Sequence, residues 1–264
     1  MNILSVGRRP TTLLQHLPKR YLLIDSGELI ARITTPHAKI FDVQRHSFNP
    51  LRSKTPRKAR ELADIFYSAD PGGAGTLTVR NGRRALAKLL MSFSRLDDLD
   101  GDRKDLAVLD ALGVVENALF SPLVRRVLTG PENFHFSGRN EGKRTPSVIL
   151  AKIDPAELGT FDAFLLGNLL MSQFQGAIVV PQFGFFATLA HKELLAQERL
   201  IAGINFFDEV PQLKNELLLI EKKIGFLTTP DDARLLAEFE GVVPGTVEHT
   251  DWVHRTIKGR PHPS

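Results

Sequence analysis

The start of the chain holds its best candidate for chemistry. An apolar run, Ile3–Val6, leads through Gly7 and a short polar link into a helical pattern at Thr11–Leu17. A strand that turns at a glycine into the N-terminus of a helix directs backbone N–H groups at an anion. The segment therefore predicts the frame of a phosphate site.

The groups that a phosphate loop needs are missing from this frame. The working motif, G-x-x-x-x-G-K-[ST], has six residues between its first glycine and its final hydroxyl. With Gly7 and Thr11 at those two positions, only Arg8, Arg9 and Pro10 lie between them, so the loop is three residues short. The second glycine falls on Arg9 and the lysine on Pro10, which has no N–H to donate. Such a loop cannot wrap a phosphate in the usual way. The cofactor-binding candidates of this vestigial loop are Gly7, Arg8, Arg9, Thr11 and Thr12.

Composition excludes several other classes of protein. The 264 residues are 42% hydrophobic, enough for a sizeable core, and contain no cysteine, which excludes disulfides and thiolate metal sites. No apolar run reaches the ~18 residues of a membrane span, and Arg8, Arg9 and Pro10 interrupt the N-terminal run, which is unlike a signal peptide. We therefore expect a cytoplasmic protein. The histidines form no zinc motif and no G-x-S-x-G elbow is present, so neither a metal site nor a hydrolase triad is predicted.

The order of elements predicts an α/β fold with a doubly wound, mostly parallel sheet, because short apolar runs alternate with helical patterns. We expect a single domain over residues 1–264 with a mainly helical insertion at about 80–130. The strands are expected at Ile3–Val6, Tyr21–Asp25, Ala38–Val43, Ser147–Lys152, Gly176–Val180, Leu200–Phe207 and Lys223–Thr228. Amphipathic helices are expected within Arg83–Phe93 and Leu106–Leu128. Further helices are expected at Phe161–Phe174, Leu189–Glu198, Val210–Ile220 and Asp231–Phe239, the last capped by Asp231, with another short helix after Pro244.

Several segments in this order resemble one family. The chain is similar to P-loop ATPases of the HerA/FtsK additional-strand type, and among them to the VirD4/TraG-like conjugative coupling ATPases. The similarity covers most of residues 2–240. It is carried by NILSVG with TTLLQHL, YLLIDSGEL (Tyr21–Leu29), HSFNPL (His46–Leu51), the strand and helix of Ser147–Gln173, GAIVVPQFGFFA (Gly176–Ala187), and KIGFLTTPDDARLLAEFEG (Lys223–Gly241).

The resemblance implies a P-loop NTPase (RecA-like) fold and shows where catalytic groups should stand. The Walker B strand of the family ends in an aspartate that orders the Mg²⁺ shell, followed by a glutamate that positions water. Those two positions are Pro181 and Gln182 here. Without carboxylates, both metal and attacking water lose their ligands. Together with the short loop and the missing lysine, this predicts a pseudoenzyme with no catalytic residues and no bound cofactor, or ATP with Mg²⁺ if it is active.

Three further residues fall at positions that matter in the family. Arg199 follows a helix where these ATPases can present an arginine finger to the next subunit; a solvated arginine is the alternative. Asp25 closes the second strand and either contacts a ligand or caps the strand end. Glu209 lies near a sensor glutamine position or simply begins a helix near Pro211.

The densest positive run is the DNA-binding candidate. Lys and Arg side chains bind phosphates without sequence selectivity, although solvated helix faces produce similar runs, and no aromatic residues interleave for base stacking. The net charge of +4 is compatible with this interpretation. The residues are Arg52, Lys54, Arg57, Lys58 and Arg60.

Three functions follow, in order of preference. The first is a non-hydrolysing assembly or DNA-associated subunit of a DNA translocation, packaging or conjugation machine, in a homo-oligomer or beside an active ATPase. The second is an active DNA-translocating ATPase with unorthodox groups, using Arg8 or Arg9 and an acid such as Asp154 or Asp208. The third is a module that binds a non-nucleotide ligand in the crevice at the carboxyl ends of the strands.

Overall fold

The computed structural model describes residues 2–7, 10–35, 38–52, 55–70, 77–136, 148–220, 222–225 and 228–258. The chain forms two compact units. The first combines Met1–Asp25 with Gly176–Ser264, and the second is the continuous segment Ser26–Gln175. That the whole chain forms one domain stays a prediction.

Five parallel strands form the centre of the first unit. Their spatial order is β2-β5-β6-β1-β7, so β1 pairs with β6 on one side and with β7 on the other. Residues of β1, β2 and β6 are buried along their whole length, which explains why these segments are mainly apolar. The bounds are β1 Ile3–Val6, β2 Tyr21–Asp25, β5 Ala177–Val180, β6 Leu200–Ile204 and β7 Lys222–Gly225.

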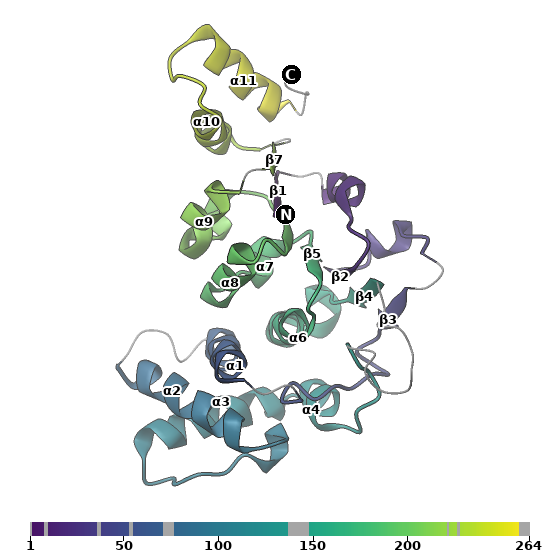
Figure 1. Ribbon diagram of the computed structural model, residues 1–264, viewed down its shortest axis with the longest axis vertical. Coiled ribbons are helices and arrows are strands. Elements are labelled where there is room, and N and C mark those ends of the chain that lie inside the picture. Colours follow the sequence, from purple (N-terminus) through teal and green to yellow (C-terminus); the bar gives the residue numbers. More distant parts are fainter. Residues whose placement is uncertain are drawn as a thin grey trace. The chain divides into compact units, whose positions relative to one another are not determined.

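Short helices connect these strands. In Figure 1, α7, α8 and α9 lie together on one side of the strands, and α10 packs against α11 near β7. The α10–α11 pair has its own small core around Ala233, Ala237 and Val253. The helices are η1 Pro10–His16, α7 Phe183–Phe186, η4 Leu189–His191, α8 Lys192–Ala196, η5 Phe207–Glu209, η6 Pro211–Leu213, α9 Lys214–Leu218, α10 Pro230–Phe239 and α11 Val247–Ile257.

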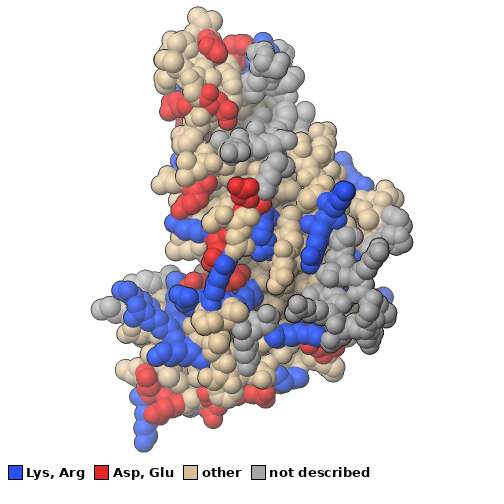
Figure 2. All heavy atoms as spheres, in the orientation of Figure 1, with Lys and Arg blue, Asp and Glu red and all other residues tan. Residues whose placement is uncertain are grey.

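The second unit is mainly helical. Two parallel strands, β3 and β4, accompany a helical layer in which α1 packs against α2, α3 and α6. Figure 2 shows Lys and Arg side chains gathered over the region where Figure 1 places α2. The bounds are η2 Ile30–Arg32, β3 Lys39–Phe41, α1 Pro56–Ala69, α2 Leu77–Ser92, η3 Leu96–Asp98, α3 Leu106–Phe120, α4 Pro122–Thr129, β4 Val148–Lys152, α5 Pro155–Leu158 and α6 Thr160–Gln173.

The predicted α/β class with a mostly parallel sheet is confirmed, but several predicted element ends are wrong. The segment Leu106–Leu128, expected to contain helices, holds two, because Pro122 at the start of α4 cannot continue α3 and the Ser121 hydroxyl caps α4 by accepting from the Val124 amide at 3.4 Å. The expected strand after Leu200 stops at Ile204. Helix α10 is capped by Thr229, whose hydroxyl accepts from the Asp232 amide at 3.2 Å, so the predicted cap at Asp231 is wrong.

Within the described ranges, no single helix has the length and apolar character needed to cross a bilayer. Helices α3 and α4 together have that length and apolar character, but their axis bends by 105° at the break between them.

His191 is expected to make the stability of the first unit depend on pH. The Thr188 amide donates to its Nδ1 at 3.0 Å, and burial lowers the pKa of this imidazole to about 4. A histidine whose folded pKa lies below its unfolded value of about 6.5 stabilises fully above that value and loses its contribution as the pH falls toward the folded pKa. We expect the free energy of unfolding to fall by about 2 kcal/mol between pH 8 and pH 5.

The measurement is denaturant unfolding at a series of pH values. His191→Gln cannot titrate, so its unfolding free energy is expected to change less than that of the wild type over this window. Equal pH dependence of the two proteins would contradict the assignment.

Candidate functional site at the carboxyl edge of the strands

The carboxyl ends of the parallel strands in the first unit meet at one edge. Val6 is in register with Ile204, and Val180 with Ala202. The residues that follow β1, β5 and β6 therefore emerge side by side, with β6 between the other two. In doubly wound folds, ligands bind at this edge. The structure thus brings Gly7, Pro181 and Asn205 to the same edge of the sheet.

Gly7 turns the chain away from β1. Its φ is 106°, in the region that favours glycine. Its amide donates to the Ile204 carbonyl oxygen at 2.8 Å and so extends the pairing of β1 with β6. A phosphate loop needs backbone amides that point at the ligand. The first amide of this turn is instead bonded within the sheet.

The helix that follows is unlike that of a phosphate loop. Element η1 is a 3-10 helix of seven residues that begins at Pro10, where an α-helix was expected over Thr11–Leu17. Proline offers no N–H at its first position, and 3-10 geometry aligns the remaining amides less well. The predicted loop residues Arg8 and Arg9 lie outside the described residues, as do the side chains of Thr11 and Thr12.

The two residues that follow β5 bring no carboxylate to the edge of the sheet. Pro181 is buried and Gln182 is exposed. A Cβ on Gly203, in the neighbouring strand, would overlap the Pro181 carbonyl oxygen and lie 3.0 Å from its carbon. The chain leaving β5 therefore crosses directly over β6. A side chain at position 203 would have no room, so glycine at this position permits the path of the Pro181–Gln182 turn.

Glu209 supplies a carboxylate beside this turn. Its Oε2 accepts from the Asn205 amide at 3.0 Å, and its Oε1 accepts from the Asn205 side chain at 2.9 Å. A Cβ on Gly184, in α7, would overlap the same carboxylate. Glu209 ends η5, just before Pro211, and both of its oxygens hold the turn after β6. Sequence alone did not reveal that it folds back toward α7.

An acidic cavity of about 530 Å³ opens at the same edge. Its walls come from the segments after β6 and β7, the two neighbours of β1. Three aspartates face one lysine, and the Lys214 amino group lies 3.7 Å from Asp208 Oδ1. Burial raises the pKa of Asp232. A polyphosphate would meet net negative charge here. The lining residues are Phe206, Asp208, Lys214, Thr229, Asp231, Asp232 and Leu235.

Other predicted site residues have local partners. Arg199 lies at the amino end of β6, and its Nε donates to the Gly176 carbonyl oxygen at 3.0 Å; its role as an arginine finger stays a prediction. Asp154 caps α5 by accepting from the Ala156 amide at 2.9 Å. Asp25 ends β2 and is buried. Among the described residues, no group of three or more His, Asp and Glu side chains is placed to hold a metal ion.

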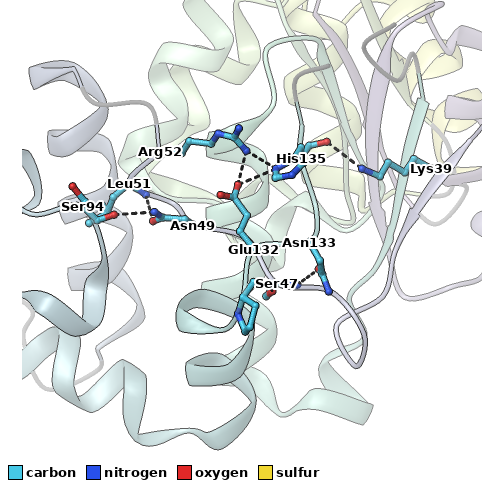
Figure 3. Close-up of polar contacts among 10 residues, drawn as sticks. Lys39, Ser47, Asn49, Leu51, Arg52, Ser94, Glu132, Asn133 and His135 are labelled. Carbon is cyan, nitrogen blue, oxygen red and sulfur yellow. Dashed lines mark hydrogen bonds and ion pairs between the residues drawn. The ribbon is translucent and has the colours of Figure 1, made fainter. Parts of the chain in front are cut away.

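The predicted DNA-binding run belongs to the second unit, and intramolecular contacts engage most of its described members. Figure 3 shows Arg52 pointing toward Glu132 and His135; its Nη1 lies 2.8 Å from Glu132 Oε1. Lys58 pairs with Glu61 at 3.2 Å, and Arg60 Nε donates to the Pro56 carbonyl oxygen at 3.2 Å. Lys54 lies outside the described residues, and Arg57 is exposed.

Hydrogen bonds of the Asn49 side chain to the backbone hold the Phe-Asn-Pro-Leu turn beside Arg52. Asn49 Oδ1 accepts from the Leu51 amide at 2.9 Å, while its side-chain nitrogen donates to the Ser94 carbonyl oxygen at 2.8 Å. Figure 3 shows these polar contacts of Asn49. Phe48 and Phe134 both pack edge-on against Phe41. Arg52 therefore ties this turn to the segment around Glu132.

No protein-family model matches the chain. No curated protein matches it either. Among solved structures, the chain is similar to the conjugative coupling protein TrwB. With the trigonal form in complex with sulphate, the TM-score is 0.54 at 12% identity, over 89% of this chain and 73% of that one. With the unbound monoclinic form it is 0.55 at 11% identity, over 82% and 66%. With the complex of ADP and Mg²⁺ it is 0.51 at 11% identity, over 82% and 67%.

The likeness to these TrwB structures shows that the chain shares their α/β fold, with a mostly parallel sheet. At such low identity it concerns the fold and not the chemistry. The chain spans between 66% and 73% of the TrwB chains compared above.

Proposed function

We propose that this chain is a coupling-protein-like subunit that does not hydrolyse nucleotide and that serves a DNA-transport machine as an assembly or DNA-associated component. The observation that carries the proposal is the edge of the sheet above β1. There the Gly7 amide is bonded to Ile204, and the helix that follows begins at a proline. Neither group is able to donate to a phosphate in this arrangement.

Three further features support the proposal. Pro181 and Gln182 bring no carboxylate to the exit of β5. The nearby carboxylate, Glu209, has both oxygens bonded to Asn205. The cavity at this edge is acidic, so a triphosphate entering it would need a metal ion to offset repulsion.

Titration calorimetry with Mg-ATP tests the proposal, together with a phosphate-release assay in the presence and absence of DNA. We expect no saturable heat up to about 1 mM Mg-ATP. A Kd above 1 mM corresponds to a binding free energy weaker than about 4 kcal/mol. We also expect no release above the buffer rate with either single- or double-stranded DNA. An active coupling ATPase in the same assay is the positive control.

Micromolar binding of Mg-ATP with DNA-stimulated release would refute the proposal and favour the active alternative. In that case Arg9→Ala should abolish turnover. Asp208→Ala would then test the acid, because Asp208 lies at the cavity, whereas the Asp154 carboxylate caps α5.

The acidic cavity gives the third function a specific reason. Its charge suits a small organic cation better than a nucleotide. A screen of amines by thermal shift is the simplest measurement, since a ligand that binds only the folded state raises the melting temperature. A hit that Asp232→Asn abolishes would favour this module over the transport subunit.

A further inference from the structure

The three exposed cations of α2 form a stripe along one side of that helix. Arg80, Arg84 and Lys88 follow one another at intervals of four residues and are all exposed. At a rise of 1.5 Å per residue, neighbours stand about 6 Å apart along the axis and the stripe extends over about 12 Å. Helix α2 contains no acidic residue.

The stripe has no partner within the described part of the chain. None of the three side chains forms an ion pair or hydrogen bond there. This distinguishes them from Arg83 on the same helix, which lies 3.6 Å from Asp64, and from Arg52, which pairs with Glu132. Like charges four residues apart destabilise a helix by a few tenths of a kcal/mol per pair. The stripe therefore destabilises α2, and no ion pair or hydrogen bond of its side chains within the described residues offsets this repulsion.

Packing fixes the rotation of α2 that turns this stripe outward. Gly82 is buried where the Tyr67 hydroxyl donates to Asp110 Oδ2 at 2.6 Å. A Cβ on Gly82 would overlap both of those oxygens. Tyr67 belongs to α1 and Asp110 to α3, so the Gly82 side of α2 faces these two helices. Arg80, Arg84 and Lys88 occupy the exposed side.

We propose that this stripe binds the phosphate backbone of DNA, an inference that rests on the proposed function. The argument is charge and spacing. One strand of duplex DNA presents a phosphate about every 3.4 Å along its axis, so the stripe spans three or four phosphates. Helix α2 carries no aromatic side chain to stack on bases. The contact is therefore independent of base sequence and depends strongly on salt.

The test is the salt dependence of binding to a fluorescent duplex of mixed sequence. The variant R80Q/R84Q/K88Q removes the stripe and keeps good helix formers. The control R32Q/R45Q/R103Q removes the same charge from three exposed arginines of the same unit that are paired with Glu28, Asp42 and Glu116. Circular dichroism and melting curves establish that both variants fold.

We expect the slope of log affinity against log salt to become shallower by about 2–3 in the stripe variant, since each lost phosphate contact removes about 0.9. Affinity at 0.1 M salt should fall on the order of 100-fold. The control should retain the slope of the wild type. Equal slopes for the two variants, or no binding by the wild type at 50 mM salt, would overturn the proposal.

Polyglutamate separates DNA from an acidic protein. Binding of polyglutamate as tight as that of the duplex at equal charge concentration would assign the stripe to an acidic protein and overturn the DNA assignment. The test of the stripe and the test of the proposed function can fail independently. Phosphate release by the wild type would refute the proposed function but would not change the salt slope. An unchanged salt slope in the stripe variant would refute DNA binding by the stripe and would say nothing about hydrolysis.

Discussion

Replacing Gly203 with alanine is expected to lower the free energy of unfolding by at least about 3 kcal/mol. The new Cβ would overlap the carbonyl oxygen of Pro181 and stand 3.2 Å from its Cα. Those atoms belong to the backbone, which has no alternative rotamer. Relief therefore requires that β5 and β6 separate at the edge of the sheet, where they pair through Val180 and Ala202.

Gly184→Ala is the matched control at the same edge. Its Cβ would overlap Glu209 Oε2, which can rotate away at the loss of its bonds to Asn205. It would also stand 3.1 Å from the Glu209 Cβ, which requires a small local shift. We expect a cost of about 1 kcal/mol, most of which Glu209→Ala should remove. Urea unfolding measures both variants. A Gly203→Ala protein as stable as the wild type would mean that Pro181 does not cross β6.

Replacing Gly82 with alanine is expected to cost about 2–6 kcal/mol, although alanine is the better helix former. The sum combines overpacking, about 1–3 kcal/mol, with the disruption of a partly buried hydrogen bond, also about 1–3 kcal/mol. The bond is that of the Tyr67 hydroxyl to Asp110. Burial and this bond raise the pKa of Tyr67, so its hydroxyl stays a donor at neutral pH.

Gly113→Ala should have the opposite sign. Nothing lies within 4 Å of a Cβ at this position in α3, so the gain in helix propensity, up to about 1 kcal/mol, is realised. Tyr67→Phe should rescue part of the Gly82→Ala loss, because it removes one of the two overlapping oxygens, and the two changes should be non-additive. A neutral Gly82→Ala would place α2 in a different rotation and remove the argument for the stripe.

The sequence predicted β1 and β2 well because both are buried along their whole length. Ile3–Val6 and Tyr21–Asp25 read as short, mainly apolar runs and are buried strands. Their parallel order followed from the alternation of strands and helices. What hydrophobic periodicity missed was the interruption between α3 and α4, which Pro122 and the Ser121 cap produce together.

Less of the candidate site could be predicted from the sequence, because its contacts join residues that are far apart along the chain. The position of Pro181 at the carboxyl edge followed from sequence, but its crossing over Gly203 did not, because the two are joined only through the sheet. Likewise, the run from Arg52 to Arg60 looked free because Glu132, the partner of Arg52, lies far along the chain. For the α2 stripe, the sequence shows only the four-residue spacing of the cations; that they have no partner within the described residues is visible only in the structure.

The pairing of β1 has a consequence for the order in which the protein is made. Both neighbours of this strand, Leu200–Ile204 and Lys222–Gly225, are translated long after it. At about 5–20 residues per second, a ribosome leaves Ile3–Val6 without hydrogen-bonding neighbours for roughly 10–40 s. The helices of Ser26–Gln175 meet no such delay, since their contacts lie within one continuous stretch. The nascent polypeptide thus exposes an apolar strand until β6 has been translated, a period in which a holding chaperone would protect it from aggregation.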